Sequence, residues 1–88
     1  MAKQVFYEGR VQGVGFRYAA KREAMGFDVF GWVRNLSDGR VEMQVDGDPD
    51  EVDEFLVAVR EGQLNGNIQG EEIHDLPPLD GVTGFNIR

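Results

Sequence analysis

The chain has 88 residues, which is enough for one domain with a single modest core and too few for two domains. It contains no cysteine and a single histidine, His74, so a disulfide framework, a cysteine nucleophile and a Cys/His zinc site are excluded. The formal net charge of −7 argues against a general nucleic-acid-binding protein, because such proteins need a basic face to neutralise phosphates. No signal-peptide pattern is evident, and no apolar run approaches the ~20 residues that span a bilayer, so we expect a cytoplasmic protein without a membrane partner.

The first third of the chain predicts a strand, a loop and a helix. Residues 3–9 are rich in β-branched and aromatic side chains, which favours a strand. A loop that contains Gly9, Gly13 and Gly15 follows. Residues 16–25 then carry apolar side chains at four-residue spacing and are rich in alanine, which predicts a helix that ends at Gly26.

Residues 27–36 and 40–46 are predicted to be antiparallel strands. The first segment is rich in aromatic and β-branched side chains, and the second alternates strictly between apolar and polar residues. Between them lies Asp38-Gly39, a pair that tolerates the backbone angles of a tight hairpin turn.

The clearest helix follows Asp48. Pro49 suits the first helical position, and Asp48 with Glu51 has the spacing of a capping box. Apolar side chains then recur at intervals of three and four residues and predict one buried stripe, formed by Val52, Phe55, Leu56 and Val59. Gly62 ends the helix.

Two strand patterns close the chain, a weak one at 71–76 and a stronger one at 82–88. The order is therefore β-α-β-β-α-β in one domain that covers residues 1–88. Two helices can bury their apolar stripes together when both pack against one face of an antiparallel sheet. This predicts an α+β fold, the ferredoxin-like sandwich, with both helices on one face of an antiparallel sheet.

The loop between the first strand and the first helix has the properties of an anion site. Free N–H groups and the dipole at a helix start attract anions, and Gly13 and Gly15 let the backbone curl so that successive N–H groups converge. Arg17, in the first helical turn, has a planar fork that grips two phosphate oxygens. Basic residues gather nearby, at Arg10, Arg17, Lys21 and Arg22. Most such junctions are nevertheless simple turns, and the Walker and dinucleotide-binding patterns are both absent.

Longer motifs carry a family resemblance. The segment Gly9 to Arg17 (GRVQGVGFR) resembles the signature loop of the acylphosphatases. The segment 31–35 (GWVRN), followed by 38–41 (DGRV) and Gly47, resembles their second signature. The resemblance covers the whole chain, up to the closing GFNIR, and departs from the family at Tyr7 and in the polar stretch after Gly62.

The resemblance implies an enzyme that hydrolyses the carboxyl–phosphate bond of small acyl phosphates and releases inorganic phosphate. It implies that Arg17 and Asn35 are the catalytic side chains, with Asn35 holding the attacking water. It also implies that the phosphoryl group is held by the loop residues Gln12, Gly13, Val14, Gly15, Phe16 and Arg17. No metal, other cofactor or nucleic-acid partner is expected, and we expect a monomer.

Elementary chemistry is consistent with a site that has two catalytic side chains and no general acid. The leaving group is a carboxylate, whose conjugate acid has a pKa of about 4, so it needs no general acid. Phosphoryl transfer passes through a loose transition state, for which positioning and charge stabilisation do most of the work.

Several residues allow other interpretations. The acids from Asp46 to Asp50 hint at a calcium loop, although the glycine and the last glutamate of that motif are absent, and helix capping explains them better. His74 is a catalytic candidate but is better explained as a solvated side chain. Arg10 and Arg34 assist the anion site or are simply solvated. Trp32 is expected in the core.

Two other function classes remain open. Domains of this kind also serve as binding or regulatory modules inside larger carbamoyl-handling proteins, although a chain that begins at Met1 and ends after the last strand favours a free-standing enzyme. An RNA-recognition sheet of the same topology needs exposed aromatics on its central strands and a basic face, and neither is evident in the sequence.

Overall fold

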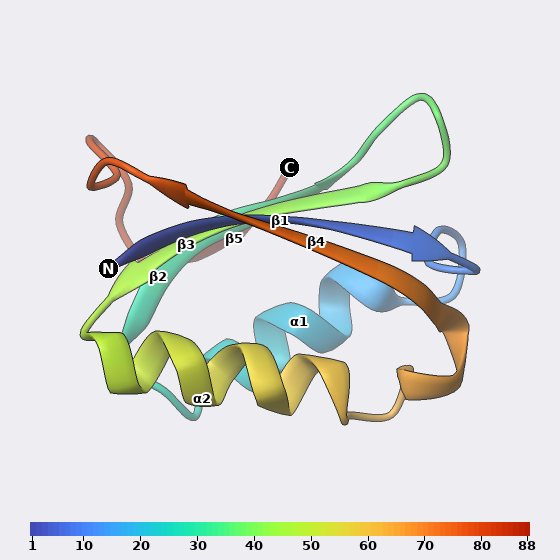
Figure 1. The fold of residues 1–88 in the computed structure, drawn as a ribbon, viewed down its shortest axis with the longest axis horizontal. Coiled ribbons are helices and arrows are strands. Elements are labelled where there is room, and N and C mark those ends of the chain that lie inside the picture. The colour runs from blue at the N-terminus through green and yellow to red at the C-terminus, as the bar shows by residue number, and fades with distance from the viewer.

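A computed structural model describes residues 1–88 and contains one five-stranded sheet with both helices on one face (Figure 1). The elements in chain order are β1 (Ala2–Gly9), α1 (Phe16–Ala24), β2 (Val29–Asn35), β3 (Val41–Gly47), α2 (Pro49–Arg60), a 3-10 turn (Asn65–Asn67), β4 (Ile68–Leu76) and β5 (Phe85–Ile87). Neither helix is long and apolar enough to cross a membrane.

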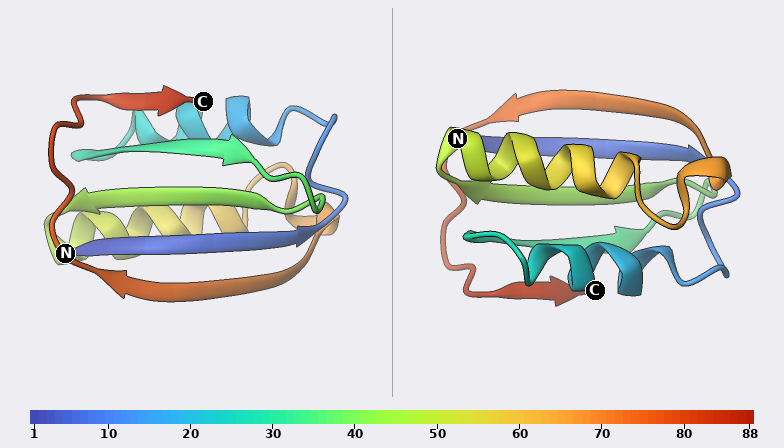
Figure 2. Two further views of the ribbon diagram at one scale, coloured as in Figure 1. Left: turned by 90° about the horizontal axis from the view of Figure 1, so that it is seen from above. Right: turned by 90° about the horizontal axis from the view of Figure 1, so that it is seen from below.

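The strands lie in the order β4-β1-β3-β2-β5. The first four are antiparallel to their neighbours, which confirms the ferredoxin-like fold. β5 departs from the predicted antiparallel arrangement, since it pairs in parallel with β2. The reason is the path of residues 77–84, which carry the chain from the β4 edge across one end of the sheet to the opposite edge (Figure 2).

β4 is longer than its sequence predicts. Instead of a weak strand at 71–76 it runs from Ile68 to Leu76 and pairs along the whole of β1. Its many polar side chains weaken the hydrophobic pattern of a strand. The strand forms nevertheless, because its backbone pairs with β1. β5 is shorter than the predicted 82–88, with three residues in ladder conformation.

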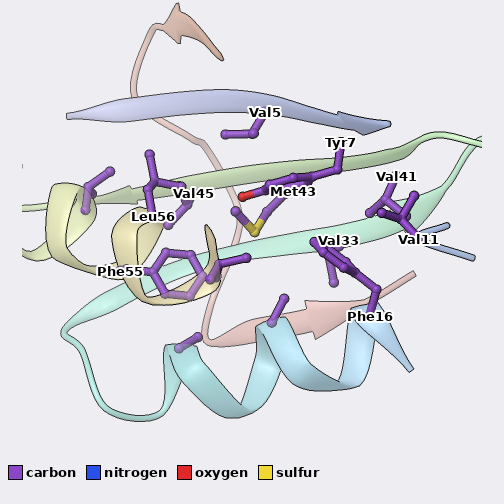
Figure 3. Close-up of a cluster of buried hydrophobic side chains, with 14 residues drawn as sticks. Val5, Tyr7, Val11, Phe16, Val33, Val41, Met43, Val45, Phe55 and Leu56 are labelled. Atoms are coloured by element: carbon purple, nitrogen blue, oxygen red, sulfur yellow. The ribbon is translucent and has the colours of Figure 1, made fainter. Parts of the chain in front are cut away.

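The core lies between the sheet and the two helices (Figure 3). As predicted, it includes the inward residues of the second hairpin strand and the apolar stripe of α2: Val41, Met43, Val45, Val52, Phe55, Leu56 and Val59. Trp32 was expected there and lies elsewhere. It is buried on the opposite, outer face of the sheet, where the guanidinium groups of Arg34 and Arg88 cover its ring at 5.2 and 4.7 Å.

The predicted capping box at the start of α2 does not form. Pro49 occupies the first position as expected, but the Asp48 side chain makes no capping hydrogen bond. Glu51 is engaged elsewhere, because its Oε1 accepts a hydrogen bond from the backbone N–H of Asp28 at 2.7 Å. That bond ties the first turn of α2 to the segment before β2.

Tyr7, the departure from the family pattern in β1, is completely buried and packs against the ring of Phe16 at 4.8 Å. Its hydroxyl has no hydrogen-bond partner in the protein. Burial, reinforced by the negative charge of Glu71, raises the pKa of the Tyr7 hydroxyl far above its usual value. The residue therefore contributes packing to the core beside the loop that precedes α1.

Candidate active site

The loop between β1 and α1 is anchored at both ends by buried side chains. Val11 and Phe16 point into the same hydrophobic cluster (Figure 3) and are 1 % and 3 % exposed. Because both anchors are fixed, the four residues between them form a short bridge across one end of the sheet. The core therefore restricts the path that these four residues can take.

Gly13 and Gly15 have left-handed backbone conformations, with φ angles of 75° and 81°. Alternation of this kind makes successive N–H groups converge on one point, the geometry of an anion-binding nest. The N–H of Ala19 donates to the carbonyl of Gly15 at 2.9 Å and closes the first turn of α1. The N–H groups before Ala19 therefore lack acceptors within the helix and are free to bind an anion.

A pocket of about 250 Å³ opens at this end of α1. Its lining combines the loop, the first turn of the helix, the end of β2 and the last strand: Val11, Gly13, Gly15, Phe16, Arg17, Tyr18, Asn35 and Ile87. Five of the seven residues that the sequence singled out therefore share one pocket. Gln12 and Val14 are not among the lining residues.

Arg17 is held in place from the chain end. Its Nη1 donates a hydrogen bond to the backbone oxygen of Arg88 at 3.1 Å. Guanidinium carries five N–H donors, so the remaining ones are available to a ligand in the pocket. The arrangement fixes one edge of the fork and leaves the other for an anion.

Asn35 is the last residue of β2 and lies on the same face of that strand as the buried Val33. That face is the one that the helices cover, so the side chain lies at the start of α1. The amide makes no hydrogen bond with the protein and is exposed. It is therefore free to accept from a water molecule and to donate to a bound anion.

Gln12 has a structural contact that the sequence did not reveal. Its Nε2 donates to the carbonyl oxygens of Leu36 and Arg40, at 2.7 and 2.9 Å. These carbonyls belong to the hairpin that follows Asn35. The side chain thus ties the glycine loop to the strand end that carries the asparagine.

The other candidates lie outside the pocket. Arg34 points to the outer face, where its Nη2 lies 2.8 Å from Oε1 of Glu42. His74 is exposed on β4 and contacts Glu72 at 2.5 Å. Asp46, part of the acidic segment, accepts hydrogen bonds from the backbone N–H groups of Gly47 and Leu79, at 2.7 and 2.9 Å.

Sequence reasoning missed three lining residues, Val11, Tyr18 and Ile87. Val11 lies within the motif GRVQGVGFR, but the resemblance gives it no role at the site. Tyr18 follows Arg17 directly, and its exposure of 70 % is a signal that only the structure provides. Ile87 comes from β5, and nothing in its local sequence indicates that the chain end reaches the first loop.

Comparison with known proteins identifies this architecture. The family model described as Acylphosphatase matches residues 3–87, almost the whole chain. The chain belongs to the acylphosphatase family. An acylphosphatase from Rubrobacter xylanophilus is 41 % identical over 85 residues, which cover 97 % of this chain and 77 % of that protein.

Solved structures agree with this assignment. The crystal structure of an acylphosphatase from Bacillus subtilis superposes with a TM-score of 0.89 at 34 % identity and covers 99 % of this chain and 97 % of that one. Full-length HypF in its phosphate- and nucleotide-bound form gives a TM-score of 0.87 at 26 % identity, covering 99 % of this chain but only 11 % of HypF. Membership of the acylphosphatase family confirms the resemblance and the expected enzyme class, a hydrolase.

Proposed function

We propose that this acylphosphatase-family chain hydrolyses small acyl phosphates in the pocket at the start of α1. The observation that carries the proposal is the convergence of the glycine loop, Arg17 and Asn35 on that one pocket. The nest of N–H groups and the guanidinium supply positive charge, and the amide supplies a free donor and acceptor.

The phosphoryl group would lie against the loop. The N–H groups from about residue 12 to residue 17 and the free edge of the Arg17 guanidinium would bind its three non-bridging oxygens. Preorganised donors of this kind stabilise the charge on those oxygens in the transition state without further reorganisation.

The attacking water would be held by Asn35. Its carbonyl oxygen accepts a hydrogen bond from the water, while its N–H group donates to the phosphoryl group. The water oxygen attacks phosphorus, and the bond between phosphorus and the acyl oxygen breaks in line with the attack. The carboxylate leaves without needing a proton, and the proton of the water passes to the phosphate that is released.

The decisive test is hydrolysis of benzoyl phosphate by the purified protein in the presence of a metal chelator, with Arg17→Ala and Asn35→Ala alongside. We expect rapid turnover that survives chelation and is lost in both variants. Circular dichroism of each variant would establish that the loss is not unfolding. Full activity in a folded Asn35→Ala variant would contradict the water-orienting role.

A second candidate function is a binding module that keeps the loop without the chemistry. The similarity of this chain to a small part of HypF supports this alternative, because the same fold occurs there within a much longer protein. If the folded wild-type protein bound inorganic phosphate but hydrolysed no acyl phosphate, the binding module would replace the enzyme.

A further inference from the structure

The positive charge that forms no ion pair is concentrated in one stretch of the chain, the loop before α1 and α1 itself. Four of the nine lysines and arginines form ion pairs with carboxylates: Lys3, Arg34, Arg40 and Arg60. The other five make no ion pair, and four of these lie between residues 10 and 22: Arg10, Arg17, Lys21 and Arg22. The chain has 16 acidic residues, so a shortage of carboxylates does not explain this distribution.

Two of these cations continue the pocket along the surface of α1. Tyr18 lines the pocket and is 70 % exposed, so the helix face on which it lies is open to solvent. Lys21 and Arg22 are exposed residues three and four positions further along, on the same face. Side chains on a helix lean toward its N-terminus, so these two lean over Tyr18 toward the pocket.

No acidic side chain of α1 shares this face. The first turn contains none, and Glu23, the only acid in the helix, is turned toward the other side. Its Oε2 lies beside Gly62, and the side chain lines the crevice between the two helices. Lys21 and Arg22 also complement the helix dipole, since they occupy the last turn. That role explains their sign, but it does not require them to be free of carboxylate partners.

Resting on the proposed function, we propose that Lys21 and Arg22 bind a second anionic group, carried by the acyl part of the substrate. The preferred substrates are then acyl phosphates whose acyl chain ends in a carboxylate or a phosphate. The phosphoryl group lies at the loop, the acyl chain crosses the ring of Tyr18, and the terminal anion meets the two cations. Four helical residues rise about 6 Å, which is about the distance from the bridging oxygen to the far carboxylate oxygen of an extended four-carbon chain such as succinyl.

The test compares succinyl phosphate with butyryl phosphate, which have the same number of carbons and differ by one carboxylate. The measurement is the ratio of their kcat/KM values at low ionic strength. In the wild-type protein we expect succinyl phosphate to be favoured in spite of the net charge of −7. Lys21→Gln and Arg22→Gln should each lower the ratio about threefold, and the double variant about tenfold, as contacts between exposed charges do. Hydrolysis of butyryl phosphate should change little.

Lys3→Gln is the matched control. It removes one positive charge near the start of β1, at the opposite end of that strand from the pocket loop, so it should leave the ratio unchanged. A second pair, 3-phosphoglyceroyl phosphate and glyceroyl phosphate, distinguishes a terminal phosphate from a terminal carboxylate. A larger effect of the variants in one pair identifies the preferred anion.

The inference is overturned if the double variant keeps the wild-type ratio in both pairs. It is also overturned if Lys3→Gln lowers the ratio as much as the double variant, because the effect then reflects net charge rather than contact. Failure of the folded wild-type protein to hydrolyse any of the four compounds would overturn the proposed function and this inference together.

Discussion

Arg17 and Arg88 are joined across the two ends of the chain, since Nη1 of the former donates to the backbone oxygen of the latter at 3.1 Å. Figure 2 shows the chain end beside α1, brought there by the parallel pairing of β5 with β2. The fifth strand therefore contributes to the geometry of the pocket. It places an acceptor that holds the guanidinium at the pocket.

Arg17→Lys tests whether both edges of the guanidinium are needed. Lysine keeps the charge, but a single ammonium group cannot donate to the Arg88 oxygen and also bind two phosphoryl oxygens in a fork. We expect kcat/KM for benzoyl phosphate to fall about ten- to hundredfold, with the fold intact by circular dichroism. Arg22→Lys provides the control, because it makes the same exchange outside the pocket lining and benzoyl phosphate carries no second anion for Arg22 to bind. Equal activity of Arg17→Lys and wild type would show that charge alone suffices.

Asn35→Ala separates water positioning from phosphate binding. The side chain makes no hydrogen bond with the protein, so its loss should not disturb the loop. We expect turnover to fall about a hundredfold or more, the scale seen when one preorganised polar group is removed from an active site. The affinity for inorganic phosphate should fall much less than turnover does, because the loop N–H groups and Arg17 supply most of the proposed phosphate contacts. A loss of phosphate affinity as large as the loss of turnover would make phosphoryl binding, not water positioning, the main role of Asn35.

Gln12→Ala should separate the loop from the hairpin that follows Asn35. The variant loses two hydrogen bonds, to the carbonyls of Leu36 and Arg40, which lowers the free energy of unfolding by about 1–2 kcal/mol. Turnover should fall as well, because the loop and the asparagine are no longer held in register. Urea titration and steady-state kinetics measure the two effects. Gln63→Ala, at an exposed position away from the pocket, should change neither quantity.

Gly15→Ala tests the backbone conformation at the start of α1. An added Cβ would meet no atom within 4 Å, so the only penalty comes from the φ angle of 81°. We expect the variant to lose about 1–2 kcal/mol of stability and to bind inorganic phosphate more weakly. Gly66→Ala is the matched control, because that site is equally open and has no positive φ. Similar behaviour of both variants would remove the argument for a nest.

Glu42 gives the outer face of the sheet a dependence on pH. Burial alone would raise the pKa of its carboxyl group, but hydrogen bonds from Gln4, Arg34 and Gln44 outweigh burial and hold the pKa below its usual value. A lowered pKa in the folded state means that the unfolded chain binds more protons. The contribution to stability is therefore complete above the unfolded pKa of about 4.5 and is lost as the pH falls through the folded value.

Glu42→Gln measures this contribution. Urea unfolding between pH 7 and pH 3 should show a shallower loss of stability in the variant than in the wild type, because the titrating group has been removed. Asp53→Asn, at an exposed position on α2, should leave the wild-type slope unchanged. Parallel pH profiles for wild type and Glu42→Gln would assign the acid sensitivity to other carboxylates.

The sequence by itself determined the elements whose signals are local. Side chains that alternate along a strand or recur every three to four residues record which face is buried, so Val41, Met43 and the stripe of α2 were predictable. The glycine loop and Arg17 were also predictable, because helix starts and left-handed backbone depend on neighbouring residues. Asn35 was predictable as a site residue only from the motif resemblance.

Only the tertiary structure decided the relationships between distant segments. The pairing of β5 with β2, the contact of Arg17 with Arg88 and the tether from Gln12 to Leu36 each join residues more than twenty positions apart. Trp32 was misplaced for a related reason. A strand pattern gives alternation between two faces, but it does not say that arginines and residues 77–84 will cover the outer one. Burial by a distant segment produces no periodic pattern in the local sequence. Only the tertiary structure therefore shows that the outer face is covered at Trp32.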